Sequence, residues 1–470
     1  CLLFSLFYAI IIINIYKREK NMHKSVYQSC VLSKIIDVPT FKLHIQKLSY
    51  GTGVDGDIIV KKGQKVKKGD IIAAFDKNFI SVNTHASVDG EIKEISKSTS
   101  VNARTGGYAQ IVSKKGVASD NYEKNTSFKE NDKDLEIDEA NLTQLDEANL
   151  LSSIDKNLNT AFDKECVSSF SSLKDHLQKM GVVQADNLSQ TAYEILKEDA
   201  SYLLINALND GFYKLEDVSV MYHEFDKIIS CVLLLNRCIK FKRCIIAINK
   251  QFKNLFDTRL IQLQESGYIN IKVHYTNMKT QKCNEQKLIE KAIGQKIGGY
   301  SYFSLRAQTA LHIYNAIMFS TPQTKCYITL HGDALKQNYI LSAPLGADIE
   351  DILSYYDMQK CTYEEFKKRE EIAYQNYKLT QDIREQIKKG VTEEEKKEIV
   401  EKRKNANKVL FDFIKFEYLY SSSLSSSLFA IYGKNKKLQT SLNFLTDKSC
   451  SEVHILTYKE LKKVKKKHKL

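Results

Sequence analysis

The stretch that decides the fold runs from Met180 to Gly211 and reads MGVVQADNLSQTAYEILKEDASYLLINALNDG. Its apolar run Tyr202–Ile205 predicts a buried strand, and the polar residues Asn206–Gly211 follow that strand directly. An open α/β sheet binds its ligand just beyond the carboxyl ends of its strands. If the protein has an active site, we therefore expect it between Met180 and Asp217.

Strands alternate with helices over residues 168–317, outward from this stretch. The candidate strands are Leu203–Asn206, Cys244–Ile248 and Ile269–His274, and the candidate helices are 219–238, 252–266 and 284–293. Such alternation predicts a doubly wound sheet of parallel strands with right-handed crossovers. We assign residues 161–322 to a Rossmann-like α/β domain.

A small all-β unit precedes this domain, at residues 40–117. Short apolar strands at 58–60, 71–75 and 91–95 are separated by turns that contain Gly63, Gly69 and Gly90, as tight hairpins require. The pattern is typical of the barrel-sandwich modules of lipoyl and biotinyl carriers. Carriers hold a lysine at the tip, where this chain has Asn83–Ser87, so we predict no swinging-arm role. We interpret His85 as a solvated turn histidine.

The other segments are assigned by composition and pattern. They are an apolar segment at 1–21, an acidic linker at 118–160, a second β unit at 323–362, and a charged helical region with a basic tail at 363–470. The apolar run Leu2–Tyr16 is shorter than the ~20 residues of a membrane span. It is either an anchor or a stretch upstream of a translation start at Met22.

Charge and cysteine spacing exclude several classes of protein. The net charge is +13, but much of the excess lies in the tail 462–469, which we interpret as a solvated segment, with an anionic membrane surface as the alternative partner. No basic pattern interleaved with aromatic residues favours nucleic acid. No two of the ten cysteines have C-x-x-C spacing, which argues against a zinc ribbon and a ferredoxin-type cluster. Cys231 and Cys238 share a predicted helical face with leucines, so we expect buried, reduced thiols in a cytoplasmic protein.

The order of these units resembles the C subunit of the Rnf electron-transport complex, RnfC. Four stretches carry the resemblance: 54–92, including Val82–Gly90; 203–250; Glu285–Ile289 with Gly294 and Gly298-Gly299; and Thr329–Ala334 through Gly346. The resemblance implies a barrel-sandwich hybrid domain, a Rossmann-like domain related to the flavin subunit of complex I, and a β-grasp domain of the SLBB type. It also implies FMN, NADH and 4Fe-4S clusters as cofactors.

The residues that should bind flavin and nucleotide depart from that family. Its phosphate loop is a glycine run, which lets backbone N–H groups approach a phosphate. Here Gly181 alone remains, branched residues follow it, and Asp186 would repel a phosphate. The family's acidic loop is replaced by Asn209–Phe212, in which we interpret Asp210 as a turn residue rather than a binding carboxylate.

The remaining cofactor motifs are also incomplete. The Asn-Val-x-Thr element that contacts flavin in the related complex I subunit keeps only Thr309. Cys361 and Cys450 cannot supply the four thiolates of one cluster, so the ferredoxin-like domain of the family is missing from this sequence. We therefore predict no catalytic, cofactor-binding or metal-binding residue, and no bound FMN, NADH or 4Fe-4S cluster.

Three functions follow from the resemblance. The first is a degenerate, structural subunit of a membrane-associated Rnf-type complex, peripheral to the cytoplasmic side of the inner membrane and bound to the other subunits. The second is an oxidoreductase subunit that still binds FMN and NADH. The third is a quinone-site subunit similar to the A subunit of the sodium-translocating NADH:quinone reductase. The first predicts that alanine at Val182, Gln184 and Asp186 leaves the activity of the complex nearly unchanged.

Overall fold

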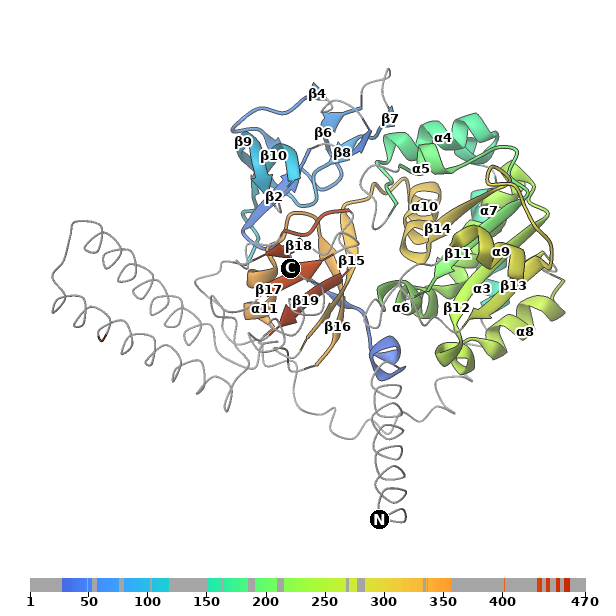
Figure 1. Ribbon diagram of the computed structural model, residues 1–470. Helices are drawn as coiled ribbons and strands as arrows, with labels where there is room; N and C mark the ends of the chain where they lie inside the picture. Colours follow the sequence, from blue (N-terminus) through green and yellow to red (C-terminus); the bar gives the residue numbers. More distant parts are fainter. Residues whose placement is uncertain are drawn as a thin grey trace, which may run out of the picture.

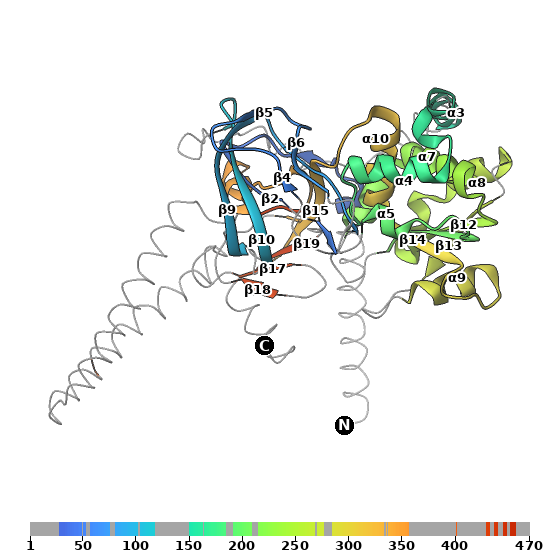
Figure 2. The same ribbon diagram turned by 90° about the horizontal axis from the view of Figure 1, so that it is seen from above.

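Three β-containing domains make up the computed structural model. In Figure 1 the small all-β domain (blue) lies above a mixed sheet (orange and red) and the α/β domain (green and yellow) lies beside both, and in Figure 2 the blue domain overlaps the mixed sheet. The structure describes residues 28–48, 50–52, 57–75, 80–101, 104–117, 150–162, 164–184, 191–208, 215–267, 270–276, 284–332, 335, 337–356, 401, 429–432, 437–439, 445–448 and 452–456. The predicted apolar segment 1–21 and the basic tail lie outside these residues. Among the described helices, none is long and apolar enough to cross a membrane.

The α/β domain is built on four parallel strands in the order β13-β12-β11-β14. The strands are β11 (Tyr202–Ala207), β12 (Arg243–Asn249), β13 (Ile271–Thr276) and β14 (Tyr302–Arg306). The three strands that the apolar runs predict are all present: β11 and β12 are buried on both faces, whereas the edge strand β13 is mostly half-buried. Since β12 lies on one side of β11 and β14 on the other, the strand order reverses between β11 and β14.

Helices cover both faces of this sheet. They are α3 (Leu150–Ala161), α4 (Phe170–Lys179), α5 (Ala192–Ile195), α6 (Glu216–His223), α7 (Phe225–Ile239), α8 (Asp257–Glu265), α9 (Glu285–Ile293) and α10 (Ala307–Phe319), with short 3-10 turns at Glu165–Val167 and Lys250–Leu255. On one face α9 packs against Leu204 and Ile245, and on the other Leu203, Ile205 and Ile246 join the main core. Successive side chains along each strand point to opposite faces of the sheet, as the pleat requires.

The elements differ from the predicted ones in several places: α4, α10 and strand β14 are not predicted, and the predicted helix 252–266 is a 3-10 turn followed by α8. The predicted helix 219–238 is two helices, α6 and α7, because the backbone of Glu224 leaves the helical conformation between them. Helix α3 lies within the predicted acidic linker 118–160 and buries Ile154 and Leu158 in the main core. Apolar side chains recur every three or four residues in α3 among polar neighbours, which is the spacing of one face of a helix.

The barrel-sandwich domain has three small sheets, in the orders β2-β10-β9-β5, β4-β6-β8 and β3-β7. Its strands are β2 (Leu43–Lys47), β3 (Gly51–Thr52), β4 (Asp57–Ile58), β5 (Lys65–Val66), β6 (Ile71–Ala74), β7 (Ile80–Ser81), β8 (Thr84–His85), β9 (Gly90–Val101) and β10 (Arg104–Val112). Gly63 and Gly69 have positive φ at two of the three predicted turns, whereas Gly90 opens β9 without a positive φ, so the prediction is wrong there. The domain closes around its own core, which includes Ile72, Ile92 and Ile111.

The third domain is a mixed sheet whose strands come from three distant parts of the chain, in the order β1-β16-β15-β19-β17-β18. They are β1 (Ile36–Asp37), β15 (Lys325–His331), β16 (Tyr339–Pro344), β17 (Phe429–Tyr432), β18 (Lys437–Gln439) and β19 (Glu452–Leu456), with helix α11 (Ile349–Tyr355). The segment predicted as a helical C-terminal region, 363–470, therefore contains three strands. Residues 357–400, which carry most of the predicted helix, lie outside the described part.

Backbone contacts join the barrel-sandwich domain to the third domain at the turn that follows β16. Ile45 N donates to Gly346 O (2.9 Å), and Gly346 has a φ of +82°. The Leu345 carbonyl accepts from Ser87 Oγ at 2.6 Å and from His44 Nδ1 at 3.2 Å. His44 Nε2 accepts from Phe41 N, and burial lowers the pKa of His44 to about 4, so the ring stays neutral and keeps both bonds.

Candidate functional site

The carboxyl edge of the parallel sheet between β11 and β14 is where the strand order reverses, and it is the place where a ligand is expected. Four polar side chains meet the end of these strands. Asn206 lies near the end of β11, Arg306 ends β14, and Glu216 and Asp217 open α6. All four are buried, so the chemistry of this edge depends on how they pair with one another.

Arg306 lies against both carboxylates of α6. Its Nε is 2.7 Å from Asp217 Oδ2, and its Nη2 is 3.9 Å from Glu216 Oε1. The side chains of Glu216 and Asp217 are 0% and 2% exposed, and that of Arg306 is 6% exposed. Buried charges are tolerated only when they are paired and hydrogen-bonded. The guanidinium is therefore the group that permits two carboxylates to stay inside the protein.

The third domain closes over this cluster through Thr329 of β15. The Thr329 hydroxyl donates to Glu216 Oε2 (2.6 Å) and accepts from the backbone N–H groups of Leu215 and Glu216 (both 2.9 Å). Asp217 Oδ1 accepts from Gln308 N at 3.0 Å. The first amides of α6, which a phosphate would need, are thus already bonded within the protein.

A second polar group occupies the other face of the same edge. Glu285, at the start of α9, accepts from Ser304 Oγ (2.9 Å) and from Asn206 Nδ2 (3.4 Å) through Oε1. The Asn206 side-chain oxygen accepts from Leu208 N (3.1 Å). Glu285 is half-buried, so this group is the more accessible of the two.

The stretch that replaces the glycine loop covers the open side of β14 rather than a ligand. Val182 and Val183 are fully buried. Gln184 Nε2 donates to Ser304 O (3.0 Å), and its Oε1 accepts from Arg306 N (3.3 Å). The amide side chain therefore substitutes for a neighbouring strand at this edge. Asp186 and Asp210, which the sequence singles out, lie outside the described residues, and Thr309 is fully buried in α10.

Gly181 and His85 meet at the contact between the α/β and barrel-sandwich domains. Gly181 has a φ of +70°, and a Cβ on it would lie 3.2 Å from His85 Nδ1 and 2.3 Å from Asn83 O. His85 is 2% exposed, so its interpretation as a solvated turn histidine is wrong. Burial lowers the pKa of His85 to about 3, with a smaller effect from nearby Lys448. The tip that would carry a lysine in a carrier domain is enclosed by the rest of the protein.

Arg306 and Lys448 are among the residues of this region that the sequence analysis does not single out. Arg306 lies in the Arg306–Thr309 stretch, where only the lost flavin motif draws attention. Lys448 lies in a polar segment, yet it is fully buried and donates from Nζ to Gly181 O at 2.5 Å. Arg306 ends β14, a strand that the sequence analysis does not predict, so Arg306 could be identified only by first recognising the short run Tyr302–Arg306 as a strand, whereas local sequence contains no comparable signal for Lys448.

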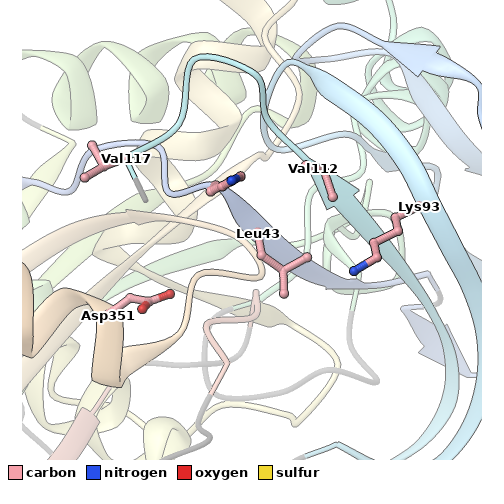
Figure 3. A pocket seen from close by; sticks show the side chains of 6 residues that line it. Leu43, Lys93, Val112, Val117 and Asp351 are labelled. Carbon is pink, nitrogen blue, oxygen red and sulfur yellow. The ribbon is translucent and has the colours of Figure 1, made fainter. Parts of the chain in front are cut away.

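A surface hollow of about 270 Å³ lies between the barrel-sandwich domain and α11. Its lining residues are Lys42, Leu43, Lys93, Val112, Val117 and Asp351. Figure 3 shows Lys93 and Asp351 on opposite sides of Leu43. None of the sheet-edge residues lines it, so it is separate from the expected ligand site.

The cysteines in the described residues are free thiols. Burial raises the pKa of the Cys231 and Cys244 thiols well above its usual range, so both stay protonated and poorly reactive. Cys231 is fully buried, whereas Cys238 is half-buried. Within the described part of the chain, no group of three or more His, Cys, Asp and Glu side chains could hold a metal ion.

Comparison with known families decides what the first domain is. The RnfC barrel sandwich hybrid domain matches residues 23–115. The chain resembles RnfC in this domain. The match spans the RnfC-like strands β2–β10, so the expected barrel-sandwich hybrid domain is confirmed. The matched segment stops before the α/β domain and the third domain.

Structural comparison adds distant neighbours of the RnfC-like chain. Crystal structures of NAD+-reducing [NiFe]-hydrogenase in the air-oxidized and H2-reduced states match with 11% and 10% identity and a TM-score of 0.34 each. Each match covers 44% of this chain and 42% of the hydrogenase chain, which is less than half of that protein. A likeness at this level assigns no function. No curated protein matches the sequence.

Proposed function

We propose that this chain is a subunit of a membrane-associated electron-transfer complex of the Rnf type, and that it contributes structure and docking rather than a bound cofactor. The RnfC-type barrel-sandwich domain supports membership in such a complex. The other subunits are then its partners, at the cytoplasmic side of the inner membrane. The α/β domain related to the complex I flavin subunit and the SLBB-type third domain belong to the same proposal.

The observation that carries the cofactor-free part is the buried cluster of Arg306, Glu216 and Asp217. A flavin phosphate at the reversal point would approach two carboxylates that share one guanidinium. The nearest helix amides are bonded to Thr329, so they cannot turn to the phosphate without loss of that contact. The residues present at this edge therefore do not fit FMN.

The contacts of Gly181 also support the absence of a bound flavin. In a phosphate loop, glycine lets backbone amides reach the ligand. Here the space beside Gly181 is filled by Asn83 O and Lys448 Nζ, 2.3 Å and 3.0 Å from the position of a Cβ. The glycine thus serves the close approach of two domains. The positive φ of Gly181 and the close approach of Asn83 O already require a glycine here, whether or not a nucleotide binds.

The test is an absorbance spectrum of the protein purified together with the other subunits of its complex. We expect the chain to co-purify with them at constant stoichiometry, and we expect its own band, once separated, to carry no flavin. Stoichiometric flavin on this chain would overturn the cofactor-free proposal. Failure to associate with any subunit of an electron-transfer complex would overturn the proposed membership.

The second candidate is a subunit that still binds FMN and NADH. The reversal of strand order between β11 and β14 favours it, together with the half-buried carboxylate of Glu285 beside Asn206 and Ser304. NADH-dependent reduction of an artificial acceptor tests it. Activity that falls at least tenfold in Glu285→Gln, with unchanged folding, would support this candidate, and no activity in the intact chain would reject it. The quinone-site function stays a prediction, to be tested by labelling with a photoreactive quinone.

A further inference from the structure

Lys448 lies in a short segment of the third domain that is tied to the turn after β16. Thr446 N donates to Ala347 O (3.0 Å), and Gly346 N donates to Thr446 O (2.8 Å). The Thr446 hydroxyl donates to Pro344 O (2.7 Å) and accepts from Ala347 N (3.0 Å). These four bonds fix the backbone just before Lys448, so the direction of its side chain is set by the third domain.

The Lys448 side chain crosses from the third domain to the other two. Its Nζ donates to the carbonyl of Gly181 in the α/β domain (2.5 Å) and lies 4.5 Å from the centre of the Tyr50 ring in the barrel-sandwich domain. The whole side chain is buried. One lysine of the third domain therefore contacts the other two domains, and its long flexible side chain is ordered because each of them supplies a partner.

The surfaces around Lys448 are closely fitted. Asn83 N donates to Gln178 O (3.2 Å), and Gln178 Nε2 donates to Ser81 O (2.8 Å), which holds the barrel tip against the end of α4. Gly181 is in the left-handed region and leaves no room for a Cβ between Asn83 O and Lys448 Nζ. Water is excluded from the amine by this packing.

The charge of Lys448 is set by this environment. Burial lowers the pKa of Lys448 from 10.5 to about 7, and Asp447, its neighbour in the chain, does not restore it. The imidazoles of His85 on β8 and His312 on α10 face the same region, and burial lowers the pKa of each to about 3. Both rings are thus neutral near pH 7. One carbonyl and one phenol ring replace the hydration that a charged amine has in water.

We propose that Lys448 is a proton-sensitive pin between the three domains, and that it holds them together most firmly when its amine is neutral. When the junction opens, the amine enters water and takes up a proton up to its ordinary pKa of 10.5. As pH falls from 10.5 towards 7, the open state gains protons that the closed state does not. The closed junction therefore weakens over this range. Below about pH 7 both states are protonated, and Lys448 adds no further pH dependence.

Hydrogen exchange of the full-length protein tests the pin. The readout is the protection factor, corrected for intrinsic exchange, of the barrel tip 83–87 and the segment 445–448 at about pH 7 and about pH 8.5. This window avoids the titration of histidines below it and of thiols above it. We expect the protection of the wild-type junction to rise roughly tenfold across the window. Unchanged wild-type protection would overturn the proposal, whatever any variant does.

The variant Lys448→Met removes the amine and keeps most of the length of the side chain. Its junction protection is expected to be the same at both pH values. The control is Lys114→Met, at an exposed lysine of the barrel-sandwich domain, which should keep the wild-type rise. If Lys448→Met retains the full rise, another group causes it and the proposal fails. If the methionine variant does not fold, Lys448→Gln provides the same comparison.

Discussion

Arg306 supplies the positive charge that lets Glu216 and Asp217 remain buried at the end of the parallel sheet. We expect Arg306→Met to lower the free energy of unfolding by about 3–5 kcal/mol, because it leaves two carboxylates inside the protein without their cation. Urea unfolding followed by circular dichroism measures the change. Arg237→Met is the matched control, since Arg237 is exposed and stacks on Phe162, and it should cost less than about 1 kcal/mol. Equal effects of the two substitutions would contradict the role given to Arg306.

Two buried histidines, His85 and His312, make the free energy of unfolding depend on pH. Burial lowers the pKa of both His85 and His312 from 6.5 to about 3. Each is therefore neutral in the folded protein but protonated in the unfolded chain below 6.5, so stability is present above 6.5 and is lost as pH falls towards 3. We expect each histidine to add about 1.4 kcal/mol per pH unit to the decline between about pH 6 and about pH 5.

Urea unfolding at several pH values measures this decline. His312→Phe keeps a buried ring but cannot titrate. The slope of its free energy of unfolding against pH should therefore be smaller than that of the wild type by the contribution of one histidine. A half-exposed histidine, His274, offers the control, and His274→Phe should change the slope far less. An unchanged slope in His312→Phe would show that the imidazole is accessible to water in the folded state.

The structure changes what substitutions at Val182 and Gln184 are expected to do, because both residues contribute to stability. The sequence predicts that alanine at these positions leaves activity nearly unchanged. Because Val182 is fully buried and Gln184 bonds both Ser304 and Arg306, alanine removes packing and leaves backbone groups of β14 unpaired. A loss of activity in these variants is therefore evidence for a binding role only if their stability is measured beside it.

At the scale of elements, Thr329 joins strand β15 of the third domain to the start of helix α6. Thr329→Val keeps the shape of the side chain but leaves the amides of Leu215 and Glu216, and one oxygen of Glu216, without their partner. We expect it to lower the free energy of unfolding by about 2–3 kcal/mol. Thr321→Val, at an exposed threonine, is the control and should be nearly neutral. Equal values for the two would mean that α6 is not held by β15.

The elements also show which parts of the fold can be predicted from the sequence. Strands β11 and β12 are apolar runs buried on both faces, which is a local pattern, and the glycine turns of the barrel are local too. The third sheet is different, since β1 has two residues and β18 has three, and such short strands carry no periodicity. Strand β1 pairs with β16, and β19 joins β15 to the hairpin of β17 and β18, so the sheet depends on partners from distant parts of the chain, which no local pattern reports.

The same limit applies to the residues of the candidate site. Glu216 and Asp217 follow a polar stretch and open a helix, where acidic residues are common on exposed surfaces. Lys448 stands between Asp447 and Ser449, as a surface lysine would. Local sequence does not predict that these three charged residues are buried, because burial of a charge depends on the docking of a neighbouring domain. The sequence does show that the family's phosphate loop has lost its glycines. This loss indicates a changed loop, but it does not tell which side chains take the place of the ligand.

At the scale of the whole molecule, the third domain closes only when distant parts of the chain meet. Strand β19 pairs with β15 on one side and β17 on the other, so it lies inside the sheet, with Val453 and Ile455 fully buried. The same C-terminal stretch carries Lys448. A chain that ends at residue 428 therefore lacks three strands and the contact that joins all three domains.

We expect this truncated chain to be insoluble, because loss of β19 exposes the edge of β15 and the apolar core beneath it. Co-expression of residues 429–470 as a separate fragment should restore soluble protein and carry the fragment through purification with it. The control fragment is the same segment with Val453→Asp and Ile455→Asp, which places charges in the core and should not rescue. A truncated chain that is soluble and cooperatively folded by itself would show instead that β15 and β16 form a domain without the C-terminal strands.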